Sequence, residues 1–205
     1  TGPLTAALKN PKAAEVVREI FLAYGPTPKA VRPLVRTLWD TQHRDKIKDI
    51  LMEYGPTGTT VKYLSQALLE HDLHAGAKDV LQRYGPFPSV VREVTKMLAE
   101  PAAQQSAGEI LREFGPTDAV VRQLTISLAD PLLSPMAEQL LVEFGPSEGR
   151  LQRLTGSLRY PPRRDAVMRI LVAYGSTAET VPYLQLVALS KKQGWEYAQK
   201  VLEMY

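Results

Sequence analysis

The segment from Arg159 to Arg164 is the part of the sequence best suited to binding an anionic group. It reads Arg-Tyr-Pro-Pro-Arg-Arg, so three guanidinium groups and a phenol ring lie within six residues, on an expected turn between two helices. A guanidinium group presents a planar fork of N–H donors that matches a carboxylate or a phosphate, and an aromatic ring can stack on a base or another ring. We therefore predict a partner-binding site that includes Arg159, Tyr160, Arg163, Arg164, Arg150 and Arg153.

The charge of the neighbouring sequence leaves two interpretations of these arginines open. Residues 97–144 contain seven acidic and two basic residues, whereas residues 145–174 contain six arginines and two acidic residues. In the first interpretation, the basic stretch binds an acidic segment of a partner. In the second, its arginines pair with the acidic stretch that precedes it, and the turn is only solvated.

A second group of basic residues recurs at intervals of thirty residues. These residues are Arg32, Lys62, Arg92 and Arg122. If equivalent helices lie side by side, the four residues form a basic ladder. Such a ladder could bind an acidic peptide or the backbone of a nucleic acid, for which we expect RNA. The alternative is that the ladder pairs with acidic residues on the second helix of a neighbouring unit, which recur in the same way: Asp49, Asp79, Glu109, Glu53, Glu113 and Glu143.

Residues that could support catalysis or metal binding are few. His71 and His74 could supply two metal ligands, with Asp72 or Glu70 as a third, but two histidines in an inter-helix turn are more commonly solvated. The sequence contains no cysteine, no HExxH motif, no nucleophile elbow and no Gly-rich loop after a strand. We therefore predict that the protein is not an enzyme and uses neither a metal nor a cofactor.

These candidate residues are carried by a repeated sequence unit. An aromatic residue followed by Gly recurs every thirty residues, and Pro follows the Gly in five of the six cases; the glycines are Gly25, Gly55, Gly85, Gly115, Gly145 and Gly175. The repeat predicts the units 1–24, 25–54, 55–84, 85–114, 115–144, 145–174 and 175–205 within a single domain 1–205. In the last unit the pattern resumes one residue late, which predicts one inserted residue between Leu189 and Ala198.

Each unit has the apolar spacing of two short helices. In the unit 55–84, Val61, Leu64 and Leu68 lie three and four residues apart and form one helical stripe, and Ala77, Val80 and Leu81 form a second. The other units carry apolar residues at the same places. The aromatic residue before each Gly extends the second stripe by one turn, which predicts that it packs in the core rather than stacking on a ligand.

Turn residues are found where the two helices should begin and end. Gly after the aromatic residue suits a left-handed residue that ends the second helix, and Pro prevents the helix from continuing. Thr27, Thr57, Thr117 and Thr177 are expected to cap the next first helix. In Asn10-Pro11, Glu100-Pro101 and Asp130-Pro131, a capping side chain precedes a Pro that is expected at the first position of the second helix.

A hairpin of two such helices is too small to bury its apolar faces alone, so the units must stack on one another. The sequence predicts an all-α fold, a right-handed α-solenoid of about seven stacked two-helix units. With the repeated [Tyr/Phe]-Gly-Pro-Thr motif and the pattern seen in Val31-Arg32-Pro33-Leu34 through Leu38, it resembles the short versions of the HEAT and armadillo-like α-solenoids. That resemblance implies an architecture and names no activity. The HEAT-like DNA glycosylases share this architecture, so they are a remote alternative. The set of catalytic residues of those enzymes cannot be matched to residues of this chain.

Composition limits the remaining classes of function. The net charge of +3 in 205 residues is too small to indicate a polyanionic partner by itself, and no apolar run approaches the roughly 18 residues of a membrane helix. With no signal-peptide pattern, the sequence favours an intracellular location. We therefore expect a non-catalytic scaffold that binds another protein, most simply an acidic segment. RNA binding by the basic ladder is the alternative.

Overall fold

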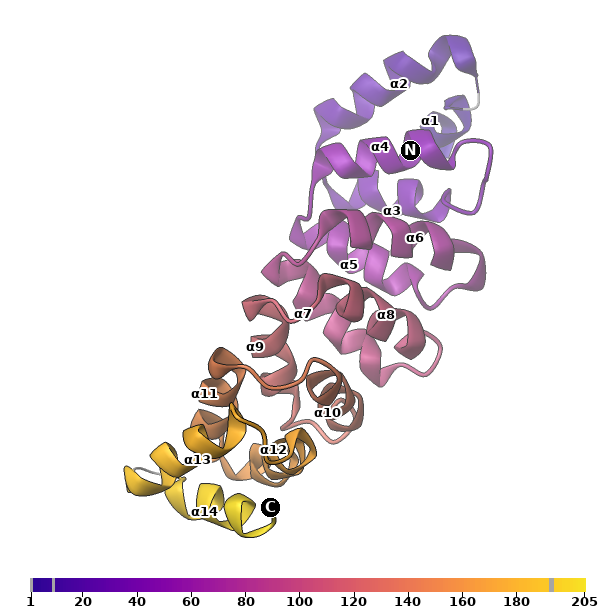
Figure 1. The fold of residues 1–205 in the computed structure, drawn as a ribbon. Helices are drawn as coiled ribbons and strands as arrows, with labels where there is room; N and C mark the ends of the chain where they lie inside the picture. The colour runs from indigo at the N-terminus through magenta and orange to yellow at the C-terminus, as the bar shows by residue number, and fades with distance from the viewer. Residues whose placement is uncertain (1, 9, 192–193) are drawn as a thin grey trace. The chain divides into compact units, whose positions relative to one another are not determined.

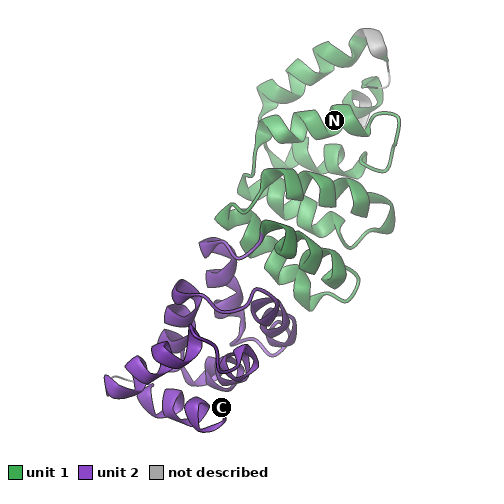
Figure 2. Cartoon of the chain, in the orientation of Figure 1, with its two compact units in different colours: residues 1–114 green, residues 115–205 purple. Residues whose placement is uncertain are grey.

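The computed structural model describes residues 2–8, 10–191 and 194–205, and within these ranges the protein consists of helices and turns without a β-strand. The described residues form fourteen α-helices and one short 3-10 helix, η1 (Figure 1). This confirms the all-α prediction. The chain divides into two compact units, residues 1–114 and 115–205 (Figure 2), which are called unit 1 and unit 2 below.

Unit 1 is built from two layers of helices that alternate along the chain. Helices α3, α5 and α7 pack on one another in order, and so do α2, α4, α6 and α8 in the second layer. The helices are α1 (Gly2–Ala7), α2 (Pro11–Tyr24), α3 (Pro28–Arg36), α4 (Arg44–Tyr54), α5 (Gly58–Ala67), α6 (His71–Tyr84), α7 (Pro88–Lys96), η1 (Met97–Ala99) and α8 (Gln104–Phe114).

Unit 2 has the same alternation. Helices α9, α11 and α13 pack in order in one layer, and α10, α12 and α14 pack in order in the other. The helices are α9 (Asp118–Ser127), α10 (Ser134–Glu143), α11 (Glu148–Ser157), α12 (Pro161–Tyr174), α13 (Thr180–Leu189) and α14 (Trp195–Glu203). In both units we call the members of the first series first helices (α3, α5, α7; α9, α11, α13). The members of the other series are second helices.

The apolar stripes seen in the sequence meet between the two layers. Val61, Leu64, Val80 and Leu81 are fully buried in unit 1, and Leu154, Leu158, Val167 and Ile170 are fully buried in unit 2. Each buried aliphatic side chain of this kind stabilises the fold by about 1.5–3 kcal/mol. The faces that the core leaves outside are the outer sides of the first and second helices and the turns between them.

The glycines that end the second helices adopt a different conformation from the one we predicted. Gly55 has φ 68° and ψ −177°, and Gly85 and Gly175 are similar, so φ is positive but ψ lies far from the left-handed helical value. This extended region is open almost only to glycine. The Pro that follows lies in a tight turn, in which the N–H of Thr57 bonds to Gly55 O at 2.9 Å, and the extended Thr57 then leads into the next first helix.

The predicted caps are confirmed in part. Thr57, Thr117 and Thr177 each accept a hydrogen bond from the backbone N–H three residues on, but the Thr27 side chain makes no such bond. Pro11 begins α2 as predicted, whereas α8 and α10 begin only at Gln104 and Ser134. There the residues after the Pro first form a tight turn, in which the N–H of Ala103 bonds to Glu100 O and that of Leu133 bonds to Asp130 O.

The tyrosines at the ends of second helices join neighbouring second helices. The hydroxyl groups of Tyr54, Tyr84 and Tyr174 donate to the carbonyl oxygens of Phe21, Leu51 and Leu141, at 2.5, 2.5 and 2.8 Å. In each case donor and acceptor lie 33 residues apart. Tyr205 makes the same bond to Leu171 across 34 residues, which agrees with the prediction of one inserted residue in the last unit. Of the segment predicted to contain the insertion, between Leu189 and Ala198, Lys192 and Gln193 lie outside the described residues.

No helix in the described part of the chain is long and apolar enough to cross a membrane.

Candidate functional site

The turn between α11 and α12 presents the predicted cluster of arginines around an exposed ring. The guanidinium carbons of Arg159 and Arg163 lie 4.9 and 5.4 Å from the centre of the Tyr160 ring, and the ring itself is 46% exposed. Cations at this distance are attracted by the π face of the ring. Neither arginine has a carboxylate within ion-pair distance in the part of the chain that the structure describes. The two guanidinium groups therefore lie against the ring, and their charges are not used in ion pairs among the described residues.

A cleft of about 230 Å³ lies beside this turn, between α11, α12 and the start of α14. Its walls bring together residues from three parts of the sequence: Leu158, Arg159, Arg164, Lys191, Gly194, Trp195, Glu196 and Tyr197. The wall thus carries three cationic side chains, two aromatic rings and one carboxylate, that of Glu196. Sequence analysis missed Lys191, Trp195 and Tyr197 as members of this site, because about thirty residues separate them from the arginines.

Arg164 is held in the wall of the cleft by the fold itself. Its Nε donates to Leu158 O at 3.1 Å, and its guanidinium carbon lies 4.2 Å from the centre of the Tyr197 ring. In the equivalent place of other units, side chains of different type make the same bond to the end of the preceding first helix: Arg44 to Leu38, His74 to Leu68 and Gln104 to Leu98. In these units the side chain at this position donates to the carbonyl oxygen at the end of the preceding first helix. Where the residue is Arg164, this donor is a cation that also lines the cleft.

Arg150 and Arg153 are engaged within unit 2. Arg150 donates from Nε to Gly145 O at 2.6 Å and from an Nη to Pro146 O at 3.1 Å. The equivalent position is occupied by Thr60 and Thr180 in two other units, and these hydroxyl groups donate to the equivalent carbonyl oxygens of Gly55 and Gly175. Arg153 forms an ion pair with Asp118. Arg150 therefore lies at the start of α11, at the opposite end of that helix from the α11–α12 turn, and neither Arg150 nor Arg153 lines the cleft. Several donors of both arginines are already used.

The predicted basic ladder lies on the exposed side of the first helices. Arg32, Lys62 and Arg92 are exposed on α3, α5 and α7 of unit 1, and Arg122 is exposed on α9 of unit 2. Arg92 approaches Glu93 on its own helix at 3.3 Å. No ion pair is formed by Arg32, Lys62 or Arg122 within the described ranges. The alternative pairing of this ladder with acidic residues of the second helices is therefore not found among the described residues.

Acidic residues of the second helices instead pair with basic residues of the neighbouring second helix. In unit 1, Lys48 approaches Asp79 at 2.8 Å, and Lys78 pairs with Glu109. In unit 2 the equivalent pair has its charges reversed: Glu138 stands at the position of the lysines and Arg169 at that of the carboxylates. Glu138 accepts two hydrogen bonds from Arg169, at 2.6 and 2.9 Å. These pairs join neighbouring second helices and lie away from the first-helix face.

The pKa values of two of these carboxyl groups reflect the pairing. Hydrogen bonds from Lys78 and Gln105 hold the pKa of Glu109 below its usual value. For Glu138, burial opposes ionisation, but the bonds from Arg169 and Ser134 outweigh it and lower its pKa as well. Both groups stay ionised at neutral pH, which identifies them as ion-pair partners rather than as proton donors.

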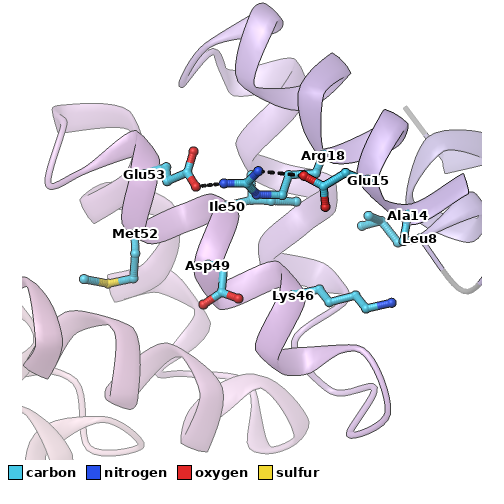
Figure 3. Close-up of a pocket in the computed structure, with 9 residues that line it drawn as sticks. All are labelled: Leu8, Ala14, Glu15, Arg18, Lys46, Asp49, Ile50, Met52 and Glu53. Carbon is cyan, nitrogen blue, oxygen red and sulfur yellow. Dashed lines mark hydrogen bonds and ion pairs between the residues drawn. The ribbon is translucent and has the colours of Figure 1, made fainter. Parts of the chain in front are cut away.

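A cavity of about 560 Å³ opens on the second-helix side of unit 1 between α2 and α4 (Figure 3). Arg18 lies across it, with one nitrogen 3.0 Å from Glu15 and another paired with Glu53, as the dashed lines in Figure 3 mark. Lys46 and Asp49 reach its edge and Ile50 forms part of its wall. Arg18 is already shared by two carboxylates, and Lys46 and Asp49 place one charge of each sign at the edge, so the cavity does not favour a ligand of one particular charge.

A second cavity, about 440 Å³, lies between α12 and α14 of unit 2 and is lined mostly by apolar side chains, among them Met168, Val172 and Met204. Val172 is 37% exposed and Met204 is 61% exposed. Sequence analysis did not single out these residues, because an exposed apolar residue looks the same in sequence as a core residue.

The histidines are not gathered into a metal site. His74 donates from Nδ1 to Leu68 O at 2.8 Å, and its Nε2 bonds to the hydroxyl group of Ser106. Both nitrogens therefore serve the packing of α6 against its neighbours. Among the described residues no group of three or more potential ligands surrounds a common point.

Comparisons of the chain with models of protein families, with curated proteins and with solved structures found no match.

Proposed function

We propose that the protein is a non-catalytic interaction scaffold that binds an acidic segment of a partner protein at the cleft beside the α11–α12 turn. In this proposal the two-helix units stack as a right-handed α-solenoid of the HEAT or armadillo-like kind. The in-order packing of first and second helices inside each unit supports that architecture.

The observation that carries the binding proposal is the different use of neighbouring arginines in unit 2. Arg153 and Arg169 are paired with Asp118 and Glu138, so the nearby acids of the α9 and α10 helices are already neutralised. Arg159 and Arg163 have no carboxylate partner in the described ranges and stack on an exposed ring. Internal ion pairing thus accounts for Arg153 and Arg169, but it does not account for Arg159 and Arg163.

The size and wall of the cleft favour part of a larger partner over a free small molecule. Its volume of about 230 Å³ lies below the roughly 300–1,000 Å³ of ordinary small-molecule sites and suits a single side chain. Trp195 and Tyr197 can pack against the apolar part of that side chain, while Arg159 and Lys191 approach its charge. Stacking already orders the arginines, which lowers the entropic cost of binding.

Charge reversal tests this site. The variant Arg159→Glu/Arg163→Glu keeps Arg164, whose bond to Leu158 belongs to the fold. We expect it to weaken binding of a fluorescent peptide of alternating Glu and Tyr by at least about tenfold, because like charges then oppose each other. Fluorescence anisotropy with the full chain measures this. The peptide with Gln in place of Glu should not bind the wild-type protein.

The matched control is Lys46→Glu/Arg83→Glu, which makes the same change of net charge on the second helices of unit 1. It should bind the acidic peptide as the wild-type protein does. Unchanged binding by the turn variant, or an equal loss in both variants, would show that the cleft is not the site.

A further inference from the structure

The basic side chains of unit 1 are concentrated on its first helices. Helices α3, α5 and α7 carry one acidic residue, Glu93, and six basic residues: Lys29, Arg32, Arg36, Lys62, Arg92 and Lys96. The second helices α4, α6 and α8 carry six basic and seven acidic residues. The small net charge of the whole sequence conceals this separation, because charges of both signs average out along the chain.

The acidic residues of the second helices do not neutralise the first-helix face. Asp79 and Glu109 are paired with Lys48 and Lys78, and Glu113 accepts a bond from Gln82, all within the second layer. On the first helices, Arg92 and Lys96 share Glu93. Arg32, Arg36 and Lys62 have no ion pair among the residues that the structure describes, so their charge remains available.

A small cavity lies on this face between α3 and α5. Arg32 and Arg36 lie on its α3 side and Tyr63 and Gln66 on its α5 side, around a volume of about 150 Å³. The exposed Glu70 at its edge offsets part of the positive charge of the two guanidinium groups. The guanidinium and amide N–H groups and the tyrosine hydroxyl can all donate hydrogen bonds, which suits a single anionic group such as a phosphate.

We propose that the first-helix face of unit 1, formed by α3, α5 and α7, binds the phosphodiester backbone of a single-stranded nucleic acid. Phosphates contact Arg32, Arg36 and Lys62 in turn, and the Tyr63 ring is available to a neighbouring base. The proposal concerns unit 1 alone and does not rest on the function proposed for the cleft in unit 2.

A nucleic acid fits this face better than an acidic peptide because, in the described ranges, the half-buried Tyr63 is the aromatic side chain that the face offers and no large apolar side chain is fully exposed on it. The exposed large apolar side chains of unit 1 in the described ranges, Val16, Tyr24, Trp39, Leu69 and Phe87, all lie outside α3, α5 and α7. A peptide would be held there only by exposed ion pairs, each worth about 0–1 kcal/mol. A nucleic acid gains additional free energy from the counterions released at every phosphate contact. A single strand is also flexible enough to follow successive helices.

The test is a salt titration of a labelled oligouridylate against the full chain, followed by fluorescence anisotropy. Removing two phosphate contacts with Arg32→Gln/Lys62→Gln should make the slope of log affinity against log salt shallower by about 1.4, and should weaken binding about 25-fold at 0.1 M salt. The control Lys46→Gln/Arg83→Gln removes the same charge from the second helices and should leave both values unchanged. Arg36→Gln alone should reduce the slope by about 0.7.

Several results would overturn the proposal. These are the absence of oligouridylate binding at low salt, an equal loss in the control variant, and tighter binding of a duplex than of the single strand. Displacement of the oligonucleotide by a polyglutamate peptide that itself binds more tightly would assign the face to acidic proteins. The variant Arg159→Glu/Arg163→Glu should keep full oligouridylate binding, so failure of the unit 2 cleft and failure of this proposal can be told apart.

Discussion

At the scale of single residues, one position serves the same structural purpose in four of the units through different chemistry. Arg44, His74, Gln104 and Arg164 all donate to the carbonyl oxygen that ends a first helix. Ser134, at the same position in the α10 unit, bonds to Glu138 instead, so the fold accepts a long donor there without requiring one and leaves its charge free to vary. This is why a basic residue can enter the wall of the unit 2 cleft without any change in the backbone around it.

Tyr84 allows the hydroxyl bonds between second helices to be tested by pH. Burial raises the pKa of Tyr84 to about 12, although the bond with Thr60 opposes this shift slightly. Between about pH 10 and 12 the unfolded state releases this proton and the folded state keeps it, so wild-type stability falls as the pH rises. Tyr84→Phe should cost about 1 kcal/mol at pH 7 through the lost bond to Leu51, and the difference from wild type should narrow above pH 10.

Urea unfolding of both proteins between pH 7 and 11 measures this effect. Tyr24→Phe is the control, because Tyr24 is 60% exposed. A constant difference between Tyr84→Phe and the wild-type protein at every pH would contradict the assigned role of burial.

At the scale of helices, close packing and ion pairs set how neighbouring elements approach. Gly76 of α6 lies against Leu38 at the end of the α3 segment, where a Cβ would come within 3.0 Å of the Leu38 Cβ. Ion pairs join the outer sides of the second helices, with the base on the earlier helix in unit 1 and the acid on the earlier helix in unit 2. Because the order of base and acid differs between unit 1 and unit 2, a mispaired helix that set Lys48 or Lys78 against Arg169 would place like charges opposite each other. The pairs can therefore help to keep the helices in register.

Two glycines inside helices should respond to alanine in opposite ways. Gly76→Ala forces its Cβ against the Cβ and carbonyl oxygen of Leu38 and should destabilise the protein by about 1–3 kcal/mol. At Gly108 the added Cβ would meet only the end of the Arg112 side chain, at 3.2 Å, which can move aside. Gly108→Ala should therefore stabilise the protein by up to about 1 kcal/mol through helix propensity. Urea unfolding tests both variants, and equal effects would show that packing at Gly76 is not restrictive.

At the scale of the whole molecule, the repeat predicts that a complete unit can be removed without loss of the fold. Deleting residues 25–54 joins Tyr24 to Gly55 and brings Leu8 to the place of Leu38, and Phe21 to the place of Leu51. Every second helix keeps a partner of the same kind, because stability in a repeat protein depends mainly on nearest neighbours.

The shortened chain should keep its helix content per residue and unfold cooperatively in urea, as measured by circular dichroism. Deleting residues 25–39 removes the first helix α3 and leaves α4 without the first helix of its own unit, although α2 and α6 still flank it, so cooperative unfolding should be lost. If the two deletions behave alike, the thirty-residue unit is not the structural unit of the protein.

The sequence by itself determined the helices and their approximate ends, because the spacing of Val61, Leu64 and Leu68 depends only on the geometry of one helix. It also located the arginines of the α11–α12 turn. Only the tertiary structure decided which charges are free, since Arg153 finds Asp118 and Lys78 finds Glu109 across more than thirty residues. Trp195 joins the cleft for the same reason. Distances between residues far apart in the chain are set by packing, and packing leaves no local pattern in sequence.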